Sequence, residues 1–436
     1  MTTTSLVIPV YNEAPDVFRA ALHSWIANKP TEIIAVIDHS DQQCIGIFNE
    51  FAAAYASSKL HFKLIVTKKP GKRPALVDGM LVASGEIIFL VDSDTIWAED
   101  VLAQAVAPFI DPHVGGVTTR QNVLAPHSIA QRLFDVYLDI RYVDEIRFLM
   151  AFGNAVTCLS GRTAVYRRTA VLPILNDLLN ETFFGRPVIS GDDKALTLLV
   201  QAQGWKVRYQ EGARVYTPGA TAMKSFLKQR LRWARNSWRA DLKALCSRWI
   251  WREPVLLLHL VDRLVQPLTT LVGPLYLFYS LAQQRWSVVV FLLFWWFLSR
   301  TVKIGPHLRR NRWNIRILPW YVLFSYWTAI IKIYAFFTMN HQGWITRWNQ
   351  SRMKLMGPLQ MAPAYVFTAL TVALMAWFVN GLHGQPVALA RTTAQPIVHT
   401  REVTTEPQPT TNLPRLWVAP YCKQTPATTP LYSQLP

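Results

Sequence analysis

Cysteine is scarce in this 436-residue chain, and the few cysteines do not form a pattern. Cys44, Cys158, Cys246 and Cys422 are far apart, with no C-x-x-C pair. This spacing argues against a disulfide framework and a cysteine-based zinc site, and it fits a reducing compartment. A signal peptide pattern is also lacking, because the first apolar run is too short and follows no basic segment. We therefore expect the N-terminal half to stay in the cytosol.

Acidic residues are few as well, with 27 Asp and Glu against 45 Lys and Arg and a net charge of +18. A basic chain can bind nucleic acid, but here the cations concentrate beside apolar segments rather than in a polar arm. Residues 224–252 combine nine lysines or arginines with four tryptophans, a pattern typical of a helix at a lipid headgroup boundary. We therefore expect a lipid bilayer as partner, and no nucleic acid.

Long apolar runs are absent from the N-terminal half and frequent in the C-terminal half. Four windows approach the ~20 residues that a helix needs to cross a bilayer, namely 264–283, 287–304, 318–338 and 362–382. Basic residues flank the third window on both sides, which predicts that both flanking loops are cytosolic. We therefore expect about three crossings, with 318–338 as an in-plane or re-entrant helix that contains Pro319 and Lys332.

The first part of the chain has the pattern of an α/β domain. Short β-branched runs alternate with amphipathic stretches, which is typical of βαβ units that build a parallel sheet. Strands are expected at 4–10, 31–38, 61–67 and 86–91, with a helix opened by Asp41 and another at 74–84. Ligands of such sheets collect beyond the carboxyl ends of the strands. The polar residues that follow these strands are Tyr11, Asn12, Glu13, Asp38, Asp92, Ser93 and Asp94.

Some of these polar residues suit a nucleotide diphosphate. Asp92 and Asp94 follow a strongly apolar run and could hold Mg²⁺ or Mn²⁺ against a leaving diphosphate, or form a solvated turn. Asp38 could accept hydrogen bonds from a uracil or ribose, or cap a helix. Lys72 and Arg73 adjoin a Pro-Gly turn and suit a pyrophosphate, with a solvated basic turn as the alternative.

Two further motifs lie nearer the middle of the chain. Asp192 and Asp193 precede an apolar helical stretch, so one is either an N-cap or a general base whose pKa its neighbour raises. Gln229, Arg232 and Trp233 are spaced i, i+3 and i+4 and share one helix face. An indole suits stacking on a sugar and a guanidinium suits a diphosphate, whereas the alternative is an interfacial Arg/Trp pair.

The order of these motifs resembles processive family 2 glycosyltransferases, with hyaluronan synthase nearest and cellulose synthase more distant. The resemblance covers roughly residues 5–350 and is carried by 8–13, Asp38, 92–94, 160–161, 191–193, Gln229, Arg232, Trp233 and 344–347. It implies a GT-A-type nucleotide-sugar-binding domain. It also implies inverting transfer from UDP-GlcNAc, UDP-GlcA or UDP-Glc to the end of a growing polysaccharide, with export of the chain.

The resemblance also implies a role for each motif. The implied nucleotide-sugar contacts are Tyr11, Asn12, Glu13, Asp38, Lys72, Arg73, Asp92 and Arg232, with Trp344, Thr346 and Arg347 as a gating segment. The implied metal ligands are Asp94 and Asp92, and the implied base is Asp193, supported by Asp192. The implied acceptor-binding residues are Cys158, Ser160, Gly161, Gln229 and Trp233. Arg162 stands where hyaluronan synthases tend to have proline, which leaves the donor sugar open.

Four regions are expected: a cytosolic GT-A-type domain at 1–218, amphipathic interface helices at 219–254, a transmembrane region at 255–383, and a Thr/Pro-rich disordered tail at 384–436. This places a multi-pass protein in the inner membrane. Since three crossings are few to enclose a polysaccharide channel, a homo-oligomer stays open. One alternative is transfer of a single sugar to a lipid carrier. A transporter with a regulatory domain would leave the aligned carboxylates unexplained.

Overall fold

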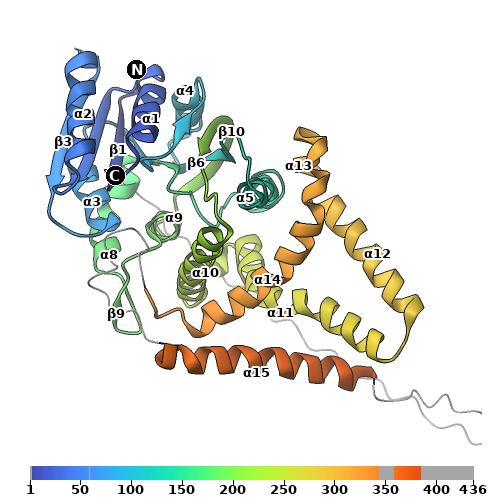
Figure 1. The fold of residues 1–436 in the computed structure, drawn as a ribbon. Coiled ribbons are helices and arrows are strands. Elements are labelled where there is room, and N and C mark those ends of the chain that lie inside the picture. The colour runs from blue at the N-terminus through green and yellow to red at the C-terminus, as the bar shows by residue number, and fades with distance from the viewer. Residues whose placement is uncertain (1, 58, 343–357, 384–436) are drawn as a thin grey trace, which may run out of the picture. The chain divides into compact units, whose positions relative to one another are not determined.

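The computed structural model describes residues 2–57, 59–342 and 358–383. All of these described residues belong to one compact unit. Within it, a sheet with its covering helices lies on one side and the long helices of the C-terminal half lie on the other (Figure 1). The predicted gating segment and the predicted tail lie outside the described residues.

The sheet has eight strands in the order β3-β2-β1-β4-β7-β6-β10-β5. They are β1 (Thr4–Val10), β2 (Glu32–Asp38), β3 (His61–Thr67), β4 (Ile87–Val91), β5 (Ile96–Trp97), β6 (Val114–Val123), β7 (Thr163–Arg167) and β10 (Lys206–Thr217). The first four confirm the expected strands to within one residue and pair in parallel. The sheet as a whole is mixed, however, because β7 runs antiparallel to β4 and β6, and β5 to β10.

Both faces of the sheet are covered, and the central strand β4 is accordingly apolar and buried at every position. Along β1, Leu6 and Ile8 belong to one hydrophobic cluster and Val7 to the other, because successive side chains point to opposite faces. The helices of this part are α1 (Pro15–Ala27), α2 (Gln42–Tyr55), α3 (Lys72–Val82), α4 (Val101–Val106), α5 (Ile129–Asp139), α6 (Ile146–Gly153), α7 (Arg168–Val171), α8 (Leu175–Leu179) and α9 (Asp192–Ala202). A short hairpin, β8 (Thr182–Phe183) and β9 (Arg186–Pro187), precedes α9.

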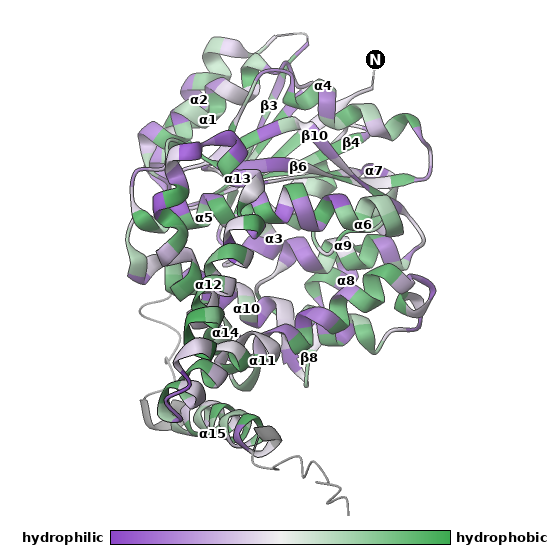
Figure 2. Ribbon diagram, turned by 90° about the vertical axis from the view of Figure 1, so that its right-hand side faces the viewer, coloured by the Kyte–Doolittle hydropathy of each residue, from purple (hydrophilic) through white to green (hydrophobic). Residues whose placement is uncertain are grey.

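The C-terminal half of the described chain is helical. It contains α10 (Met223–Leu245), α11 (Pro254–Ala282), α12 (Trp286–Lys303), α13 (Gly305–Arg310), α14 (Leu318–Phe337) and α15 (Pro358–His383). Four of its helical segments are long and apolar enough to cross a membrane: 254–282, 286–303, 312–337 and 362–381. Figure 2 shows hydrophobic residues along α14 and α15. The four expected apolar windows are therefore helices.

Helix α14 contacts the rest of the protein at both of its ends. Leu318 and Phe324, near its start, belong to the hydrophobic cluster that also covers the sheet. Just beyond its end, the Thr338 hydroxyl accepts a hydrogen bond from Arg235 Nε of α10 at 3.0 Å. This arrangement supports the in-plane orientation expected for 318–338, which remains a prediction.

A buried polar network fastens α13 to α5. Asp139 accepts hydrogen bonds from His307 Nδ1 at 2.8 Å and from Arg310 Nε at 3.1 Å, and Arg310 also pairs with Asp135. By spacing alone, Asp135, Asp139 and His307 could hold a metal ion. Because the guanidinium of Arg310 already occupies the carboxylate oxygens, we interpret the group as a structural ion-pair network.

Candidate active site

The candidate site lies beside β1, where the order of the strands in the sheet reverses. Strand β1 lies between β2 and β4, so a ligand is expected at the carboxyl ends of these strands. Asp38 ends β2, where its Oδ1 accepts hydrogen bonds from Ser40 N and Oγ at 2.8 and 2.6 Å. Tyr11 and Asn12 follow β1, and Asn12 has a left-handed backbone with φ of 47°. The expected position of these polar residues is confirmed.

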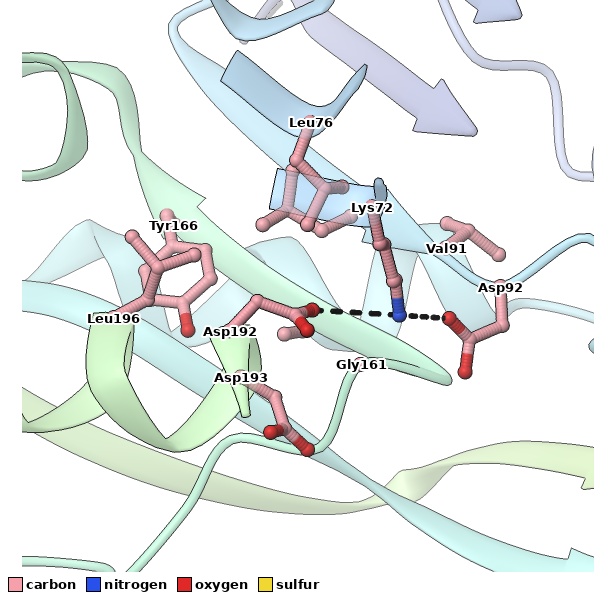
Figure 3. A pocket seen from close by; sticks show the side chains of 11 residues that line it. Lys72, Leu76, Val91, Asp92, Gly161, Tyr166, Asp192, Asp193 and Leu196 are labelled. Atoms are coloured by element: carbon pink, nitrogen blue, oxygen red, sulfur yellow. Dashed lines mark hydrogen bonds and ion pairs between the residues drawn. The ribbon is translucent and has the colours of Figure 1, made fainter. Parts of the chain in front are cut away.

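Lys72 links two acidic motifs that are far apart in the sequence. Its Nζ lies 2.5 Å from Asp92 Oδ1 and 3.4 Å from Asp192 Oδ2 (Figure 3). Burial disfavours the ammonium, but the two carboxylates outweigh burial and raise the pKa of Lys72. Asp193 and Gly161 line the same pocket. Predicted residues from four separate segments therefore meet here.

Asp192 and Asp193 are the first two residues of α9. The N-cap is Gly191, with φ of 84°, so the reading of either carboxylate as an N-cap is wrong. The position of Asp192 in the first helical turn favours its charged form. Burial alone would raise the pKa of Asp192, but Lys72 and Arg73 lower it. A net rise in the pKa of Asp192 is therefore not found, because the two cations outweigh the effects that would raise it.

Gly161 is placed so that a side chain would enter the pocket. A Cβ at this position would lie 3.1 Å from Lys72 Nζ and 3.7 Å from both Asp92 Oδ1 and Asp193 Cβ. Three charged side chains thus surround Gly161. A larger residue at this position would have to displace at least one of them.

Thr197 on α9 connects the predicted acceptor loop to the predicted base. Its hydroxyl donates to the carbonyl of Asp193 at 2.7 Å and accepts from the backbone N–H of Leu159 at 2.8 Å. The Oδ1 of Asp193 itself accepts from the N–H of Lys194 at 2.8 Å. These hydrogen bonds therefore fix the position of the predicted acceptor loop relative to Asp193.

The expected metal ligands belong to a group of three carboxylates. Burial, followed by the charges of Asp92 and Glu13, raises the pKa of Asp94 to about 6. Glu13 Oε2 accepts from Ser93 Oγ at 2.9 Å, and Asp94 Oδ2 accepts from Thr217 Oγ1 at 3.4 Å. A divalent cation would relieve the mutual repulsion, and carboxylate oxygens are ligands that Mg²⁺ and Mn²⁺ prefer. The donor set therefore fits the expected ion.

Helix α10 brings Arg232, one residue of its predicted motif, near the pocket carboxylates. Arg232 lies close enough to the pocket carboxylates that they oppose the lowering of its pKa by burial. The Oε1 of Gln229 is buried and has no hydrogen-bond partner in the part of the chain that is described. Trp233 packs 5.6 Å from the Phe134 ring, and the Arg162 guanidinium lies 5.4 Å from its centroid. The indole is therefore partly covered by protein.

Cys158 and Ser160 shape the acceptor loop rather than line the pocket. Burial raises the pKa of the Cys158 thiol to about 12, and its carbonyl accepts from Arg141 at 3.1 Å. Ser160 is buried, and its hydroxyl lies 3.5 Å from the guanidinium of Arg162. Of the three loop residues expected at the acceptor, Gly161 alone lines the pocket.

Arg73 does not line the pocket, and its pyrophosphate contact stays a prediction. Its guanidinium is buried and donates to Leu178 O at 2.9 Å, Glu181 Oε2 at 2.7 Å and Ser190 O at 3.3 Å. It thus holds the segment that leads to Asp192. The remaining predicted contacts, Trp344, Thr346 and Arg347, lie outside the described residues.

Sequence reasoning missed two positioning residues on α10. Asn236 Oδ1 accepts from Ser190 Oγ at 2.8 Å and from Arg239 at 2.6 Å. A Cβ at Gly191 would lie 3.2 Å from the Asn236 side chain, so the two backbones approach closely. Asn236 and Arg239 follow Arg232 at i+4 and i+7, a helical spacing that could have indicated them.

Known proteins resemble the chain over most of its length. A type 2 glycosyltransferase of Zymoseptoria tritici is 26% identical over 362 residues, which cover 79% of this chain and 75% of that protein. An N-acetylglucosaminyltransferase of Rhizobium meliloti is 26% identical over 372 residues, which cover 83% of this chain and 85% of that protein. Sequence similarity thus extends into the helical half.

A solved structure of another protein has a fold similar to that of this chain. The mannosyltransferase PcManGT from Pyrobaculum calidifontis, in complex with GDP-Man and Mn²⁺, matches with a TM-score of 0.51 and 19% identity, covering 72% of this chain and 88% of that one. The sequence profile described as glycosyltransferase-like family 2 matches residues 2–236, more than half of the chain. The chain therefore belongs to glycosyltransferase-like family 2, and it is a glycosyltransferase with a GT-A-like domain followed by helices.

Proposed function

We propose that this glycosyltransferase adds sugars from a UDP-sugar, with inversion, to the end of a growing polysaccharide at the membrane. The observation that carries the proposal is the bridge from Lys72 to Asp92 and Asp192, which brings the donor-side and base motifs together beside Asp193 and Gly161. Relatives named N-acetylglucosaminyltransferase make UDP-GlcNAc the first donor to test, before UDP-GlcA and UDP-Glc.

The donor would bind across the carboxyl ends of β1, β2 and β4. Asp38, fixed by Ser40, is placed to accept a hydrogen bond from the uracil or ribose. Mg²⁺ or Mn²⁺ held by Asp94 and Asp92 would supply positive charge for the leaving diphosphate. Arg232 adds a positive charge near Asp92, Asp192 and Asp193.

The transfer step needs a proton acceptor on the side opposite the leaving group. Asp192 is held in its ionised form by Lys72, which leaves Asp193 as the carboxylate that takes the proton of the acceptor hydroxyl. The hydroxyl oxygen then forms a bond to the anomeric carbon while the bond from that carbon to the diphosphate oxygen breaks. UDP leaves, and the anomeric configuration is inverted.

The division into a catalytic region at 1–218, interface helices at 219–254 and a membrane region at 255–383 is part of this proposal. Its support is that the last strand, β10, ends at Thr217 and only helices follow in the described residues. Phe226 of α10 and Phe324 of α14 pack in the same hydrophobic cluster as sheet residues, so the regions contact one another. We propose that the catalytic region lies at the inner membrane and faces the cytosol, since nucleotide sugars are made in the cytosol. We also propose that the product is exported.

Membranes containing the protein, supplied with each UDP-sugar in turn and with Mg²⁺ or Mn²⁺, test the proposal. Products are sized by chromatography and digested with linkage-specific hydrolases. We expect a ladder or a long polymer in the aqueous phase. A single sugar recovered on an organic-soluble lipid would instead indicate the carrier reaction, and an absence of transfer from every UDP-sugar would contradict the proposal.

A further inference from the structure

A second hollow borders a different face of α10 from the one that carries the active-site motif. It has a volume of about 950 Å³ and is walled by α10, α14 and α15. This is at the upper end of the roughly 300–1,000 Å³ that ligand sites occupy. Its wall is mainly apolar and includes Leu227, Leu231, Ile330, Val372 and Ala376.

Two cations stand at the α10 side of this groove. Lys224 and Lys228 both line it, are exposed, and are four residues apart on one helix face. In the part of the chain that the structure covers, neither lysine has an acidic partner within ion-pair distance. The site thus combines an apolar volume with positive charge at its edge.

This combination matches one ligand chemistry, an anionic headgroup attached to a hydrocarbon chain. Two exposed ammonium groups attract a free phosphate only weakly in water. The apolar wall would gain nothing from such an ion, whereas it would gain from burying methylene groups. Both α14 and α15 contain segments apolar enough to cross a bilayer, so the groove opens where lipid chains are abundant.

We propose that the groove binds an anionic phospholipid, with its acyl chain against α14 and α15 and its phosphate against Lys224 and Lys228. Residues of α10 from 224 to 231 line the groove, and the adjacent face of the same helix carries Gln229, Arg232 and Trp233. A bound lipid therefore supports the helix that presents these side chains. The proposal concerns a site outside the active-site pocket and does not depend on the sugar that is transferred.

Native mass spectrometry of the full-length protein from vesicles of phosphatidylglycerol and phosphatidylcholine tests the proposal. We expect phosphatidylglycerol to be retained preferentially. Lys224→Gln with Lys228→Gln should weaken this retention about fivefold for each lysine removed. Arg312→Gln with Arg316→Gln is the matched control, since these two exposed cations lie outside the groove. The control should retain the lipid as the wild-type protein does.

A second pair of variants tests the groove itself. Ala369→Trp fills the groove and should reduce retention of phosphatidylglycerol, whereas Leu374→Trp, on α15 but outside the lining, should not. Melting temperatures would establish that both variants fold. The proposal would be overturned if the protein retained phosphatidylcholine as well as it retains phosphatidylglycerol. It would also be overturned if inorganic phosphate displaced the bound lipid. A polyprenyl phosphate that displaces the phospholipid and receives sugar would also overturn it, because the groove would then be an acceptor site.

Discussion

At the scale of single residues, the site distinguishes two neighbouring carboxylates by their surroundings. Asp192 faces Lys72, which outweighs burial and keeps its pKa low. Asp193 shares the pocket but has no ion pair with a described residue. Its carbonyl and Oδ1 are held by Thr197 and by the backbone of the same turn. The ion pair with Lys72 therefore distinguishes two residues that the sequence presents as equivalent, and it is the basis for proposing different tasks for them.

Asp193→Asn should abolish sugar transfer while UDP binds almost as before, because the change removes a proton acceptor and no proposed nucleotide contact. Loss of a general base costs on the order of 10²- to 10⁴-fold in rate. Turnover and UDP affinity are measured on the same preparation, with Asp177→Asn, an exposed carboxylate on α8, as the control. If Asp193→Asn keeps more than half of the wild-type turnover, Asp193 is not the base.

Gly161→Ala should raise the KM for the donor about ten- to a hundredfold, since a misplacement of about 1 Å at a site can have that effect. The new Cβ would lie 3.1 Å from Lys72 Nζ and would displace the ammonium from its bridge. Steady-state kinetics check this expectation. Gly46→Ala is the control because a Cβ there meets nothing within 4 Å. Equal KM values for the two variants would show that the bridge tolerates displacement.

Chelation by EDTA should stop transfer by the wild-type protein, and added Mn²⁺ should restore it. Asp94→Ala should be inactive with or without Mn²⁺, because the leaving diphosphate would lose its counter-charge. The exposed Asp16→Ala serves as control and should respond to chelation and to Mn²⁺ as the wild type does. Full activity in EDTA would contradict the assignment of Asp94 and Asp92 as metal ligands.

At the scale of helices and strands, the sequence predicted where an element lies along the chain better than which elements contact one another. Strands β1 to β4 and the helix that follows Asp41 were found from apolar periodicity and a capping residue, which are local signals. The antiparallel insertion of β7 between β4 and β6 was not, because strand pairing depends on contacts far apart in the chain. For the same reason the bridge from Lys72 to Asp192 and the inward turn of Arg73 could not be predicted.

Asp139→Asn should lower the melting temperature, because Asp139 fastens α13 to α5. Burial opposes the charged form, but His307 and Arg310 outweigh burial, so the pKa of Asp139 is below its ordinary value of 3.8. A lowered carboxyl pKa stabilises the fold above the unfolded pKa, and this stabilisation is lost as pH falls through the folded pKa. Melting temperatures measured from neutral pH down to below 3.8 should therefore converge for variant and wild type. A difference that stays constant into that acidic range would contradict the role.

At the scale of the whole molecule, the helical half contacts the catalytic region at the segment that precedes the proposed base. The side chain of Gln342, a few residues beyond α14, accepts from the N–H of Ile189 and donates to Pro187 O, each at 2.9 Å. These two backbone groups lie three and five residues before Asp192 in the sequence. The residues that follow α14 therefore lie beside the segment that leads to the proposed base.

This contact bears on whether α14 crosses the bilayer. Its composition allows a crossing. A crossing would place the two ends of α14 on opposite sides, yet the start packs in the cluster that covers the sheet and the residues after the end bond to the segment before α9. We therefore expect a cysteine at Gln342, with the four native cysteines replaced, to be protected from an impermeant thiol reagent in intact cells. It should react after permeabilisation, which separates sidedness from burial, and a cysteine at Thr393 should react in intact cells. Labelling of position 342 from outside would show that α14 crosses and that the proposed cytosolic side is wrong for the segment that follows it.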